Sequence, residues 1–268
     1  MDNNSIVQLR QIQLQILNEF VRICQVNSLR YCLYAGTCLG AVRHKGYIPW
    51  DDDIDVVMPR ADYDKFIQIT TKEDNSDFFL DYYTTNHSYG HNFAKFCKKH
   101  TLFIEPNGIR QAIYIDVFPQ DKVPGPDFVA KSKIPVLIHK IDALTTVRRD
   151  GLKGRDFKTK IVFYITRWMP TRWLYCWEKK LMTRFEKTDA KYYLNYGTRY
   201  AFINETILIT EFEPYVQMVF EGKKYHVQQV YVLRFLSCSS VDPYDSEFYL
   251  WMRRKADSLC WNERVIKI

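Results

Sequence analysis

Residues 33–55 read LYAGTCLGAVRHKGYIPWDDDID, and this stretch decides how the rest of the 268-residue chain is interpreted. It holds three glycines, one basic triplet and four carboxylates within a short span. The carboxylates are Asp51, Asp52, Asp53 and Asp55. Carboxylates this close repel one another, which lowers stability unless a cation lies among them. The stretch therefore predicts a cation-binding site.

Strand periodicity predicts where the carboxylates point. Residues 54–58, IDVVM, read as a strand that Pro59 ends. Side chains two apart on a strand share a face, so Asp53 and Asp55 are expected on one face, continued by Asp51, with Asp52 turned away.

A further carboxylate, Asp116, lies inside the apolar run of residues 113–118, IYIDVF, which also reads as a strand. Its apolar neighbours place it at a sheet surface rather than in open water. Asp53, Asp55 and Asp116 would then converge from two strands as an oxygen-only site, the donor set that Mg²⁺ or Mn²⁺ prefers.

Basic and small residues stand upstream of the acids. Gly36 and Thr37 follow a predicted strand and open a short predicted helix, and a helix N-terminus favours phosphate oxygens. Arg43, His44 and Lys45 supply positive charge just beyond. A pocket with metal on one side and phosphate on the other suits in-line displacement at phosphorus.

This order of motifs resembles the nucleotidyltransferase (polymerase β-like) superfamily. Residues 35–63, AGTCLGAVRHKGYIPWDDDIDVVMPRADY, resemble the LicD family, which includes fukutin and fukutin-related protein. Residues 115–119, IDVFP, match a second family block, and Lys95 matches a family lysine on the preceding strand. A weaker likeness at residues 220–225, FEGKKY, is followed by departures from the family pattern.

The resemblance implies an α+β fold: a nucleotidyltransferase-type mixed sheet with flanking helices and a helical elaboration. LicD proteins move phosphocholine from CDP-choline to a sugar hydroxyl of a cell-surface glycan, and relatives move polyol phosphates such as ribitol phosphate. The implied catalytic and metal-binding residues are Asp53, Asp55 and Asp116, holding Mg²⁺ or Mn²⁺. The implied substrate-binding residues are Gly36, Thr37, Arg43, His44 and Lys95.

The expected partners follow from the same resemblance. They are a CDP-activated phospho-alcohol donor and a glycan acceptor of lipopolysaccharide, capsule or teichoic acid type, with a lipid-linked acceptor as a further expectation. Two alternatives stay open, because charge and motifs fit them as well. One is a non-catalytic relative that binds nucleotide or glycan as a scaffold, and the other is a nucleotidyltransferase that releases pyrophosphate.

The chain is expected to divide into three parts that differ in composition and predicted secondary structure. A helix is predicted over residues 5–26, and two strands, 91–105 and 109–118, are predicted on either side of a turn. The expected parts are a catalytic core over residues 1–124, a basic and aromatic helical region over 125–200, and a C-terminal part over 201–268 that packs on the core.

Charge is concentrated in the middle of the chain. The net charge is +7, but residues 128–200 alone hold seventeen Lys and Arg against six Asp and Glu. This excess indicates an anionic partner, and nucleic acid is disfavoured because no RNA- or DNA-binding module is recognised. Trp168, Trp173 and Trp177 lie among these basic residues, either on an anionic membrane or as the core of a helix pair.

Other function classes are disfavoured. The uncharged stretches are far shorter than the roughly 20 apolar residues that a membrane span needs. The seven cysteines form no C-x-x-C pair, so neither a disulfide framework nor a zinc site is indicated. With its polar N-terminus the chain is expected to be cytoplasmic, with contact to the inner face of the membrane as a further expectation.

Overall fold

The computed structural model describes residues 3–73, 75–86, 88–105, 108–152, 154–197, 202, 205–237 and 265–267. The helices are α1 (Asn3–Val26), α2 (Ala35–Arg43), α3 (Arg60–Lys72), α4 (Pro126–Lys131), α5 (Ile134–Asp150), α6 (Phe157–Thr166), α7 (Thr171–Met182) and α8 (Gln229–Ser237), with short 3₁₀ turns at Thr183–Phe185 and Ile209–Glu211.

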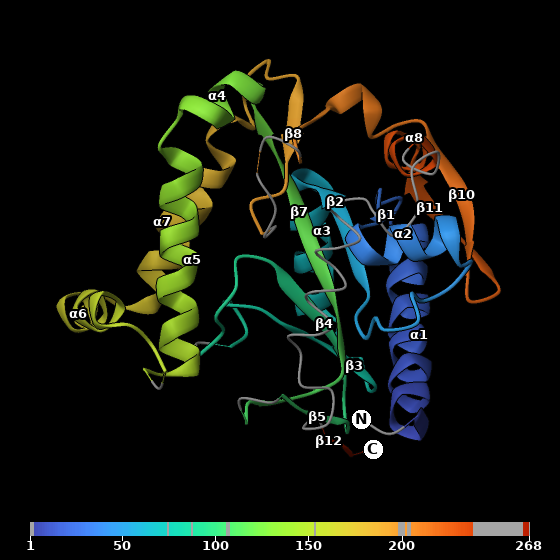
Figure 1. Ribbon diagram of the computed structural model, residues 1–268, viewed down its shortest axis with the longest axis horizontal. Helices are drawn as coiled ribbons and strands as arrows, with labels where there is room; N and C mark the ends of the chain where they lie inside the picture. Colours follow the sequence, from blue (N-terminus) through green and yellow to red (C-terminus); the bar gives the residue numbers. More distant parts are fainter. Residues whose placement is uncertain are drawn as a thin grey trace.

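The strands are β1 (Cys32–Leu33), β2 (Asp55–Pro59), β3 (Phe78–Asp81), β4 (Ala94–Lys98), β5 (Leu102–Ile104), β6 (Arg110–Gln111), β7 (Tyr114–Val123), β8 (Tyr192–Leu194), β9 (Ile207–Leu208), β10 (Tyr215–Phe220), β11 (Lys223–Gln228) and β12 (Val265–Lys267). The central sheet has the order β10-β11-β1-β2-β7-β4-β3. β2 pairs with β7 and β1 with β11 in parallel, while the other neighbours are antiparallel. The predicted mixed sheet with flanking helices is confirmed (Figure 1).

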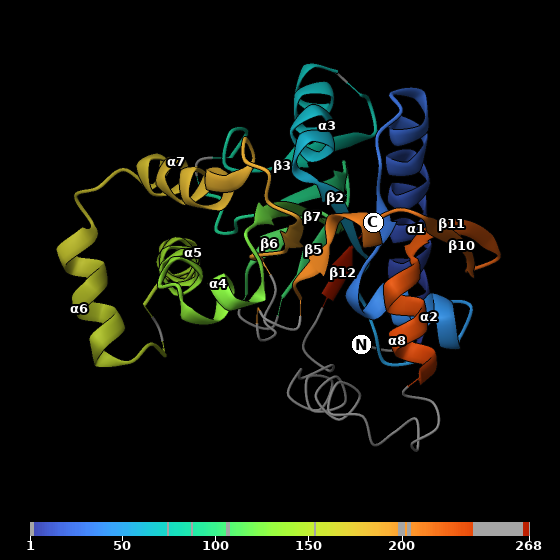
Figure 2. The same ribbon diagram turned by 90° about the horizontal axis from the view of Figure 1, so that it is seen from above.

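Helices cover both faces of this sheet. α1 and α3 lie together on one side and α5 on the other, as Figure 2 shows. The Phe20 ring of α1 meets the Phe66 ring of α3 at 5.0 Å between centroids, and both side chains are fully buried. The apolar stripe at helical spacing over residues 5–26 therefore becomes one wall of the main core, and the predicted helix there is confirmed.

The strands after Gly90 differ from the two predicted, because each predicted segment is divided, and β7 continues past the predicted end at 118 to Val123. The segment 91–105 contains β4 and β5 separately, because the chain turns between them at His100, whose φ is +61°. The Thr101 hydroxyl accepts a hydrogen bond from the Ile113 backbone at 2.9 Å, which holds this turn against the start of β7. Residues 106 and 107 of the predicted turn lie outside the described residues, and Glu105 and Gly108 on either side are joined by a backbone hydrogen bond of 2.8 Å.

The segment with the weak family likeness forms a hairpin that supports the loop after α2. β10 and β11 are joined through Glu221 and Gly222, both at positive φ, as a tight two-residue turn requires. The Glu221 carboxylate accepts a hydrogen bond from the Tyr47 backbone at 3.0 Å. The backbone N–H of Glu221 donates to the Lys45 carbonyl at 2.9 Å. Residues 174 positions apart are thus held together.

A buried ion pair joins α3 to the far end of β7. The Arg60 guanidinium donates to both carboxylate oxygens of Asp121, at 2.6 and 2.8 Å. The two side chains are 3% and 0% exposed. Burial alone would lower the pKa of Arg60, but the Asp121 charge outweighs it and the pKa is raised. The family-like residues 58–63 therefore include a structural residue, Arg60.

The region after β7 is mainly helical, and β8 returns from it to pair with β7. α4, α5 and α7 enclose a small second core with β8, made by Val123, Val129, Ile138, Met182, Leu194 and Tyr196. Within the described residues, no helix combines the length and the apolar character that a membrane crossing requires.

One acid is buried between these helices, and its removal is expected to stabilise the fold. Burial raises the pKa of the Glu178 carboxyl well above its usual range, and the charge of Asp142 adds to this shift. A carboxyl with a raised pKa in the folded state stabilises the protein at acid pH and loses that contribution as pH rises. Glu178→Gln is expected to raise the free energy of unfolding by about 2 kcal/mol at pH 8.

Urea denaturation at pH 5 and pH 8 measures this effect. The gain should shrink toward pH 5, because the raised pKa leaves a growing fraction of the wild-type carboxyl protonated in the folded state as pH falls. The amide of glutamine keeps the contact with Asn92, which now donates to Glu178 at 3.4 Å. An equal effect at both pH values would show that charge burial at this residue is not the cause.

Candidate active site

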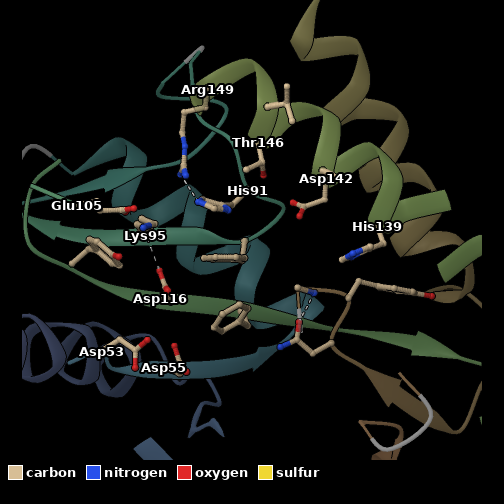
Figure 3. Close-up of a pocket in the computed structure, with 18 of the residues that line it drawn as sticks. Asp53, Asp55, His91, Lys95, Glu105, Asp116, His139, Asp142, Thr146 and Arg149 are labelled. Carbon is tan, nitrogen blue, oxygen red and sulfur yellow. Dashed lines mark hydrogen bonds and ion pairs between the residues drawn. The ribbon is translucent and has the colours of Figure 1, made fainter. Parts of the chain in front are cut away.

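Four charged residues form one row across the central sheet, and the outermost, Asp81 of β3, lies opposite Lys95 and outside the cavity lining. In the parallel pair of β2 and β7, Asp55 lies opposite Asp116. In the antiparallel pair of β7 and β4, Asp116 lies opposite Lys95. Residues directly opposite on neighbouring strands project from the same face, so the row is a consequence of strand register. Figure 3 shows the carboxylates of Asp53, Asp55 and Asp116 facing one another at the floor of a cavity.

The cavity measures about 990 Å³ and lies between the sheet and α5. Its sheet side includes Asp52, Asp53, Asp55, Lys95 and Asp116. This is large enough for a nucleotide together with part of an acceptor.

Lys95 is held inside this row. Its side chain is 4% exposed, its Nζ lies 4.0 Å from Asp116 Oδ1, and it sits 3.3 Å from the centre of the Tyr114 ring. It also donates to Gln111 Oε1 at 3.3 Å, and Gln111 donates in turn to Glu105 at 2.5 Å. Burial lowers the pKa of Lys95, although the Asp116 and Glu105 charges oppose the shift. The buried Lys95 ammonium group therefore lies among acidic side chains at the cavity floor.

The acidic loop before β2 is anchored from α1. Arg10 donates to the backbone carbonyls of Ile48, Pro49 and Asp51 at 2.7–3.0 Å. Gln13 donates to the Asp52 carbonyl at 2.8 Å. These contacts fix the loop that carries the acids.

Two acidic groupings share Asp53. Ligand oxygens of Asp51, Asp52 and Asp53 come within 4.8 Å of one another in the described part of the chain. Strand alternation predicted that Asp52 turns away from the site, but Asp52 lines the cavity. The prediction fails because β2 begins only at Asp55, so residues 51–54 do not follow strand geometry. The loop acids and the Asp53, Asp55 and Asp116 set are both candidates for binding a cation.

Thr37 positions the first residue of β2. Its hydroxyl accepts a hydrogen bond from the Asp55 backbone at 2.9 Å, and its side chain is buried. Gly36 precedes it in the first turn of α2, next to Tyr34 and Ala35, which line the cavity. Gly36 and Thr37 therefore lie at the edge of the site rather than among its lining residues.

Arg43 and His44 lie at the opposite end of α2 from Gly36. Arg43 is in the last turn, and the His44 backbone closes the helix on Gly40. Neither residue belongs to the set that lines the cavity. Burial lowers the pKa of His44, and the charge of Arg43 lowers it further. The structure therefore brings together Asp53, Asp55, Lys95 and Asp116 but leaves Arg43 and His44 apart from them.

The opposite wall is formed by α5 and the start of α6. Side chains of His139, Asp142, Thr146 and Arg149 point from α5 toward the sheet in Figure 3. Arg149 contacts His91 Nε2 and donates to Asp150 at 2.6 Å. These residues were not predicted individually, since single residues in a helix carry no motif. The basic excess of residues 128–200 was the available signal, because it places Lys140, Arg149, Arg155 and Lys158 on this wall.

Residues 28–142 match the family model described as "LicD/FKTN/FKRP, nucleotidyltransferase domain". The chain carries a LicD-family domain. The matched range includes Asp55, Asp116 and Lys95, whereas Arg149 lies beyond its end.

Three curated proteins are similar to part of this chain. The "Lipopolysaccharide cholinephosphotransferase LicD" of Haemophilus influenzae is 35% identical over 114 residues, which are 41% of this chain and 42% of that protein. An uncharacterized protein of Rickettsia prowazekii is 29% identical over 132 residues, 48% of this chain and 47% of that protein. An uncharacterized protein of Rickettsia typhi is 40% identical over 55 residues, 20% of this chain and 18% of that protein. The chain therefore matches less than half the length of each of these relatives.

Proposed function

We propose that this LicD-type protein is a divalent-metal-dependent transferase. It moves a phospho-alcohol from a CDP-activated donor to a sugar hydroxyl of a cell-surface glycan. The observation that supports this most directly is the row of Asp55, Asp116 and Lys95 on the cavity floor, facing the cationic wall that contains Arg149. Carboxylates opposite fixed cations fit a ligand that has a diphosphate and needs a metal ion.

The residues fit the metal that the family resemblance implies. Asp53, Asp55 and Asp116 offer carboxylate oxygens alone, which suits Mg²⁺ or Mn²⁺. When bound, such an ion would neutralise negative charge on the donor phosphates. Lys95 and Arg149 would bind the remaining phosphate oxygens, and the first turn of α2 at Gly36 and Thr37 would lie beside them.

Asp116 has a second proposed role. It stands between Asp55 and Lys95, where it would orient the acceptor hydroxyl and take its proton. The acceptor oxygen then forms a bond to the β-phosphorus of the donor, and the bond from that phosphorus to the bridging oxygen breaks. CMP leaves with the bond electrons, and the phospho-alcohol is joined to the sugar. Arg43 and His44 are proposed to meet the substrate outside the cavity.

Aromatic lining residues favour phosphocholine over a polyol phosphate. Tyr34, Phe93 and Phe118 line the cavity, with Phe93 and Phe118 rings 4.3 Å apart and Tyr34 and Phe118 rings 5.9 Å apart between centroids. Ring faces attract a quaternary ammonium group, whereas a polyol needs hydrogen bonds. The Haemophilus relative is described as acting on lipopolysaccharide, so a lipopolysaccharide-like acceptor is the proposed glycan class.

Titration calorimetry tests this proposal. CDP-choline, CDP-glycerol and CDP-ribitol are each titrated with Mg²⁺ and with EDTA into the wild type and Asp55→Asn. We expect CDP-choline to bind with Mg²⁺ and to bind at least about tenfold more weakly with EDTA or in the variant. Asp189→Asn, a change at an exposed acid outside the cavity lining, should leave binding unchanged.

Two further measurements distinguish the two acidic groupings and the two possible transfer reactions. Asp51→Asn should weaken binding less than Asp55→Asn; the reverse order would assign the metal to the loop acids. Release of CMP identifies phospho-alcohol transfer, whereas release of pyrophosphate would identify nucleotidyl transfer. If the affinity for the donor is the same with Mg²⁺, with EDTA and in Asp55→Asn, the proposed site is contradicted.

A further inference from the structure

A second surface with a distinct chemistry lies on the helical region. We call Phe157–Lys180, which includes α6 and most of α7, the α6–α7 arm. Its helix α6 lies at the edge of the molecule, beyond α5 as seen from the sheet (Figures 1 and 2). None of the α6 residues is buried. Exposed large apolar residues gather here, and they are Phe157, Ile161, Val162, Tyr164, Ile165, Trp168, Trp173 and Trp177.

In α6 these residues form a stripe. Phe157, Ile161 and Ile165 are spaced by four, so they lie on one face of the helix. Tyr164 falls on the same face, and Trp168, in the turn that follows α6, is 73% exposed. Such a face is the form of a helix that lies in a membrane interface.

α7 continues this surface. Arg172, Trp173, Cys176, Trp177 and Lys180 are exposed. The opposite side of the helix, which includes Leu174 and Tyr175, is buried against the body of the protein. The sequence alone leaves open whether these tryptophans form a core or a surface. Since Trp168, Trp173 and Trp177 are 45–73% exposed, they form a surface.

The exposed charge on the arm has one sign. Its basic residues are Lys158, Lys160, Arg167, Arg172, Lys179 and Lys180, of which Lys179 is paired with Asp64 at 3.0 Å. Its single acid, Glu178, is 1% exposed. By helical spacing, Lys158 flanks the apolar stripe of α6 on one side, and Lys160 and Arg167 flank it on the other. Two copies of a surface this basic would repel one another, so an anionic partner fits better than a second copy.

The arm is fixed relative to the cavity. Arg148 of α5 donates to the backbone carbonyls of Thr166 and Met169, at 2.5 and 2.8 Å, and to the Thr171 hydroxyl at 3.1 Å. Lys158 and Val162, on another face of α6, line the cavity. A surface bound by the stripe of α6 would therefore lie beside the cavity wall.

We propose that the α6–α7 arm binds the surface of an anionic lipid membrane, with the apolar stripe of α6 and the exposed tryptophans inserted among the headgroups. Aromatic and aliphatic side chains supply the apolar contact, and the flanking Lys and Arg attract lipid phosphates. The binding needs neither donor nor metal, so it stands apart from the transferase proposal. It would hold the cavity next to acceptors that are attached to lipid.

Vesicle sedimentation of the full chain tests the arm. Vesicles of phosphatidylglycerol with phosphatidylethanolamine are compared with vesicles of phosphatidylcholine alone, without nucleotide and with EDTA. The wild type should bind the anionic vesicles, with a blue shift of tryptophan fluorescence. Ile161→Ser with Ile165→Ser, and Trp168→Ser with Trp173→Ser, should each weaken binding by about tenfold or more. Lys160→Glu with Arg167→Glu should do the same.

Matched variants elsewhere separate the arm from general effects. Val7→Ser with Val26→Ser removes two exposed apolar residues of α1, and Lys223→Glu with Lys224→Glu reverses two exposed charges of β11. Both pairs should bind vesicles like the wild type. The proposal is overturned by equal binding of the two vesicle types, by binding that survives the arm variants, or by no binding. The proposal is also overturned if the wild type is a dimer that Trp168→Ser dissociates. Binding of an oligonucleotide instead of vesicles would overturn it as well.

Discussion

Asp116→Asn is expected to lower the turnover of donor by about 10³-fold. Asp116 stands in the middle of the row, opposite Asp55 on one strand and Lys95 on the other. Asparagine has nearly the same shape but carries no charge and cannot accept the proton of the acceptor hydroxyl. The variant therefore loses a proposed metal ligand and a proposed base in one change.

Release of CMP from CDP-choline in the presence of a glycan acceptor measures this loss. Asp189→Asn is the matched control, because it makes the same chemical change at an exposed position. Urea denaturation of Asp116→Asn should show a free energy of unfolding near that of the wild type, because the lost attraction to Lys95 is offset by weaker repulsion among Asp53, Asp55 and residue 116. A variant that keeps a tenth or more of the wild-type turnover would contradict the assignment of Asp116.

Asp121→Ala is expected to lower the free energy of unfolding by about 4 kcal/mol. It leaves the fully buried Arg60 guanidinium without the carboxylate that accepts two of its hydrogen bonds. The longer ion pair of Arg60 with the partly exposed Asp64, at 3.6 Å, would compensate the buried charge poorly, so this loss costs far more stability than the loss of an exposed pair. The measurement is urea denaturation at pH 7, fitted to a two-state transition.

The matched control is Arg22→Ala, which breaks the ion pair with Glu19 on the surface of α1. The Arg22 side chain is 55% exposed there, so its loss should cost less than about 1 kcal/mol. Arg60→Met combined with Asp121→Leu should recover most of the stability, because two apolar residues need no partner. A loss in Asp121→Ala no larger than that in Arg22→Ala would show that the pair contributes little.

The floor of the candidate site follows from local sequence. Alternation of Ile54, Asp55 and Val56 places Asp55 on a sheet face, and the apolar neighbours of Asp116 do the same. What alternation cannot supply is register: Lys95 lies opposite Asp116 because β4 pairs with β7, a long-range choice. The family resemblance supplied Lys95 instead.

Other parts of the site required the tertiary structure. Asp52 was expected to point away, but its loop is set by Arg10 and Gln13 of α1, which are about forty residues distant in sequence. The cavity wall at Arg149 depends on how α5 packs over the sheet, and no residue spacing encodes that. The exposure of Trp168 could not be predicted either, because the same pattern of aromatic residues serves buried helix pairs.

The hairpin of β10 and β11 has a consequence for how this protein can be divided. The family signature ends at residue 142, yet β1, near its start, has β11 as its parallel neighbour, and the loop after α2 is held by Glu221. The acidic loop is likewise anchored by α1, which precedes the signature. The stretch that the family model matches is thus held in place by contacts from both before its start and beyond its end. A design that transfers this site to another scaffold would therefore have to include α1 and the hairpin of β10 and β11.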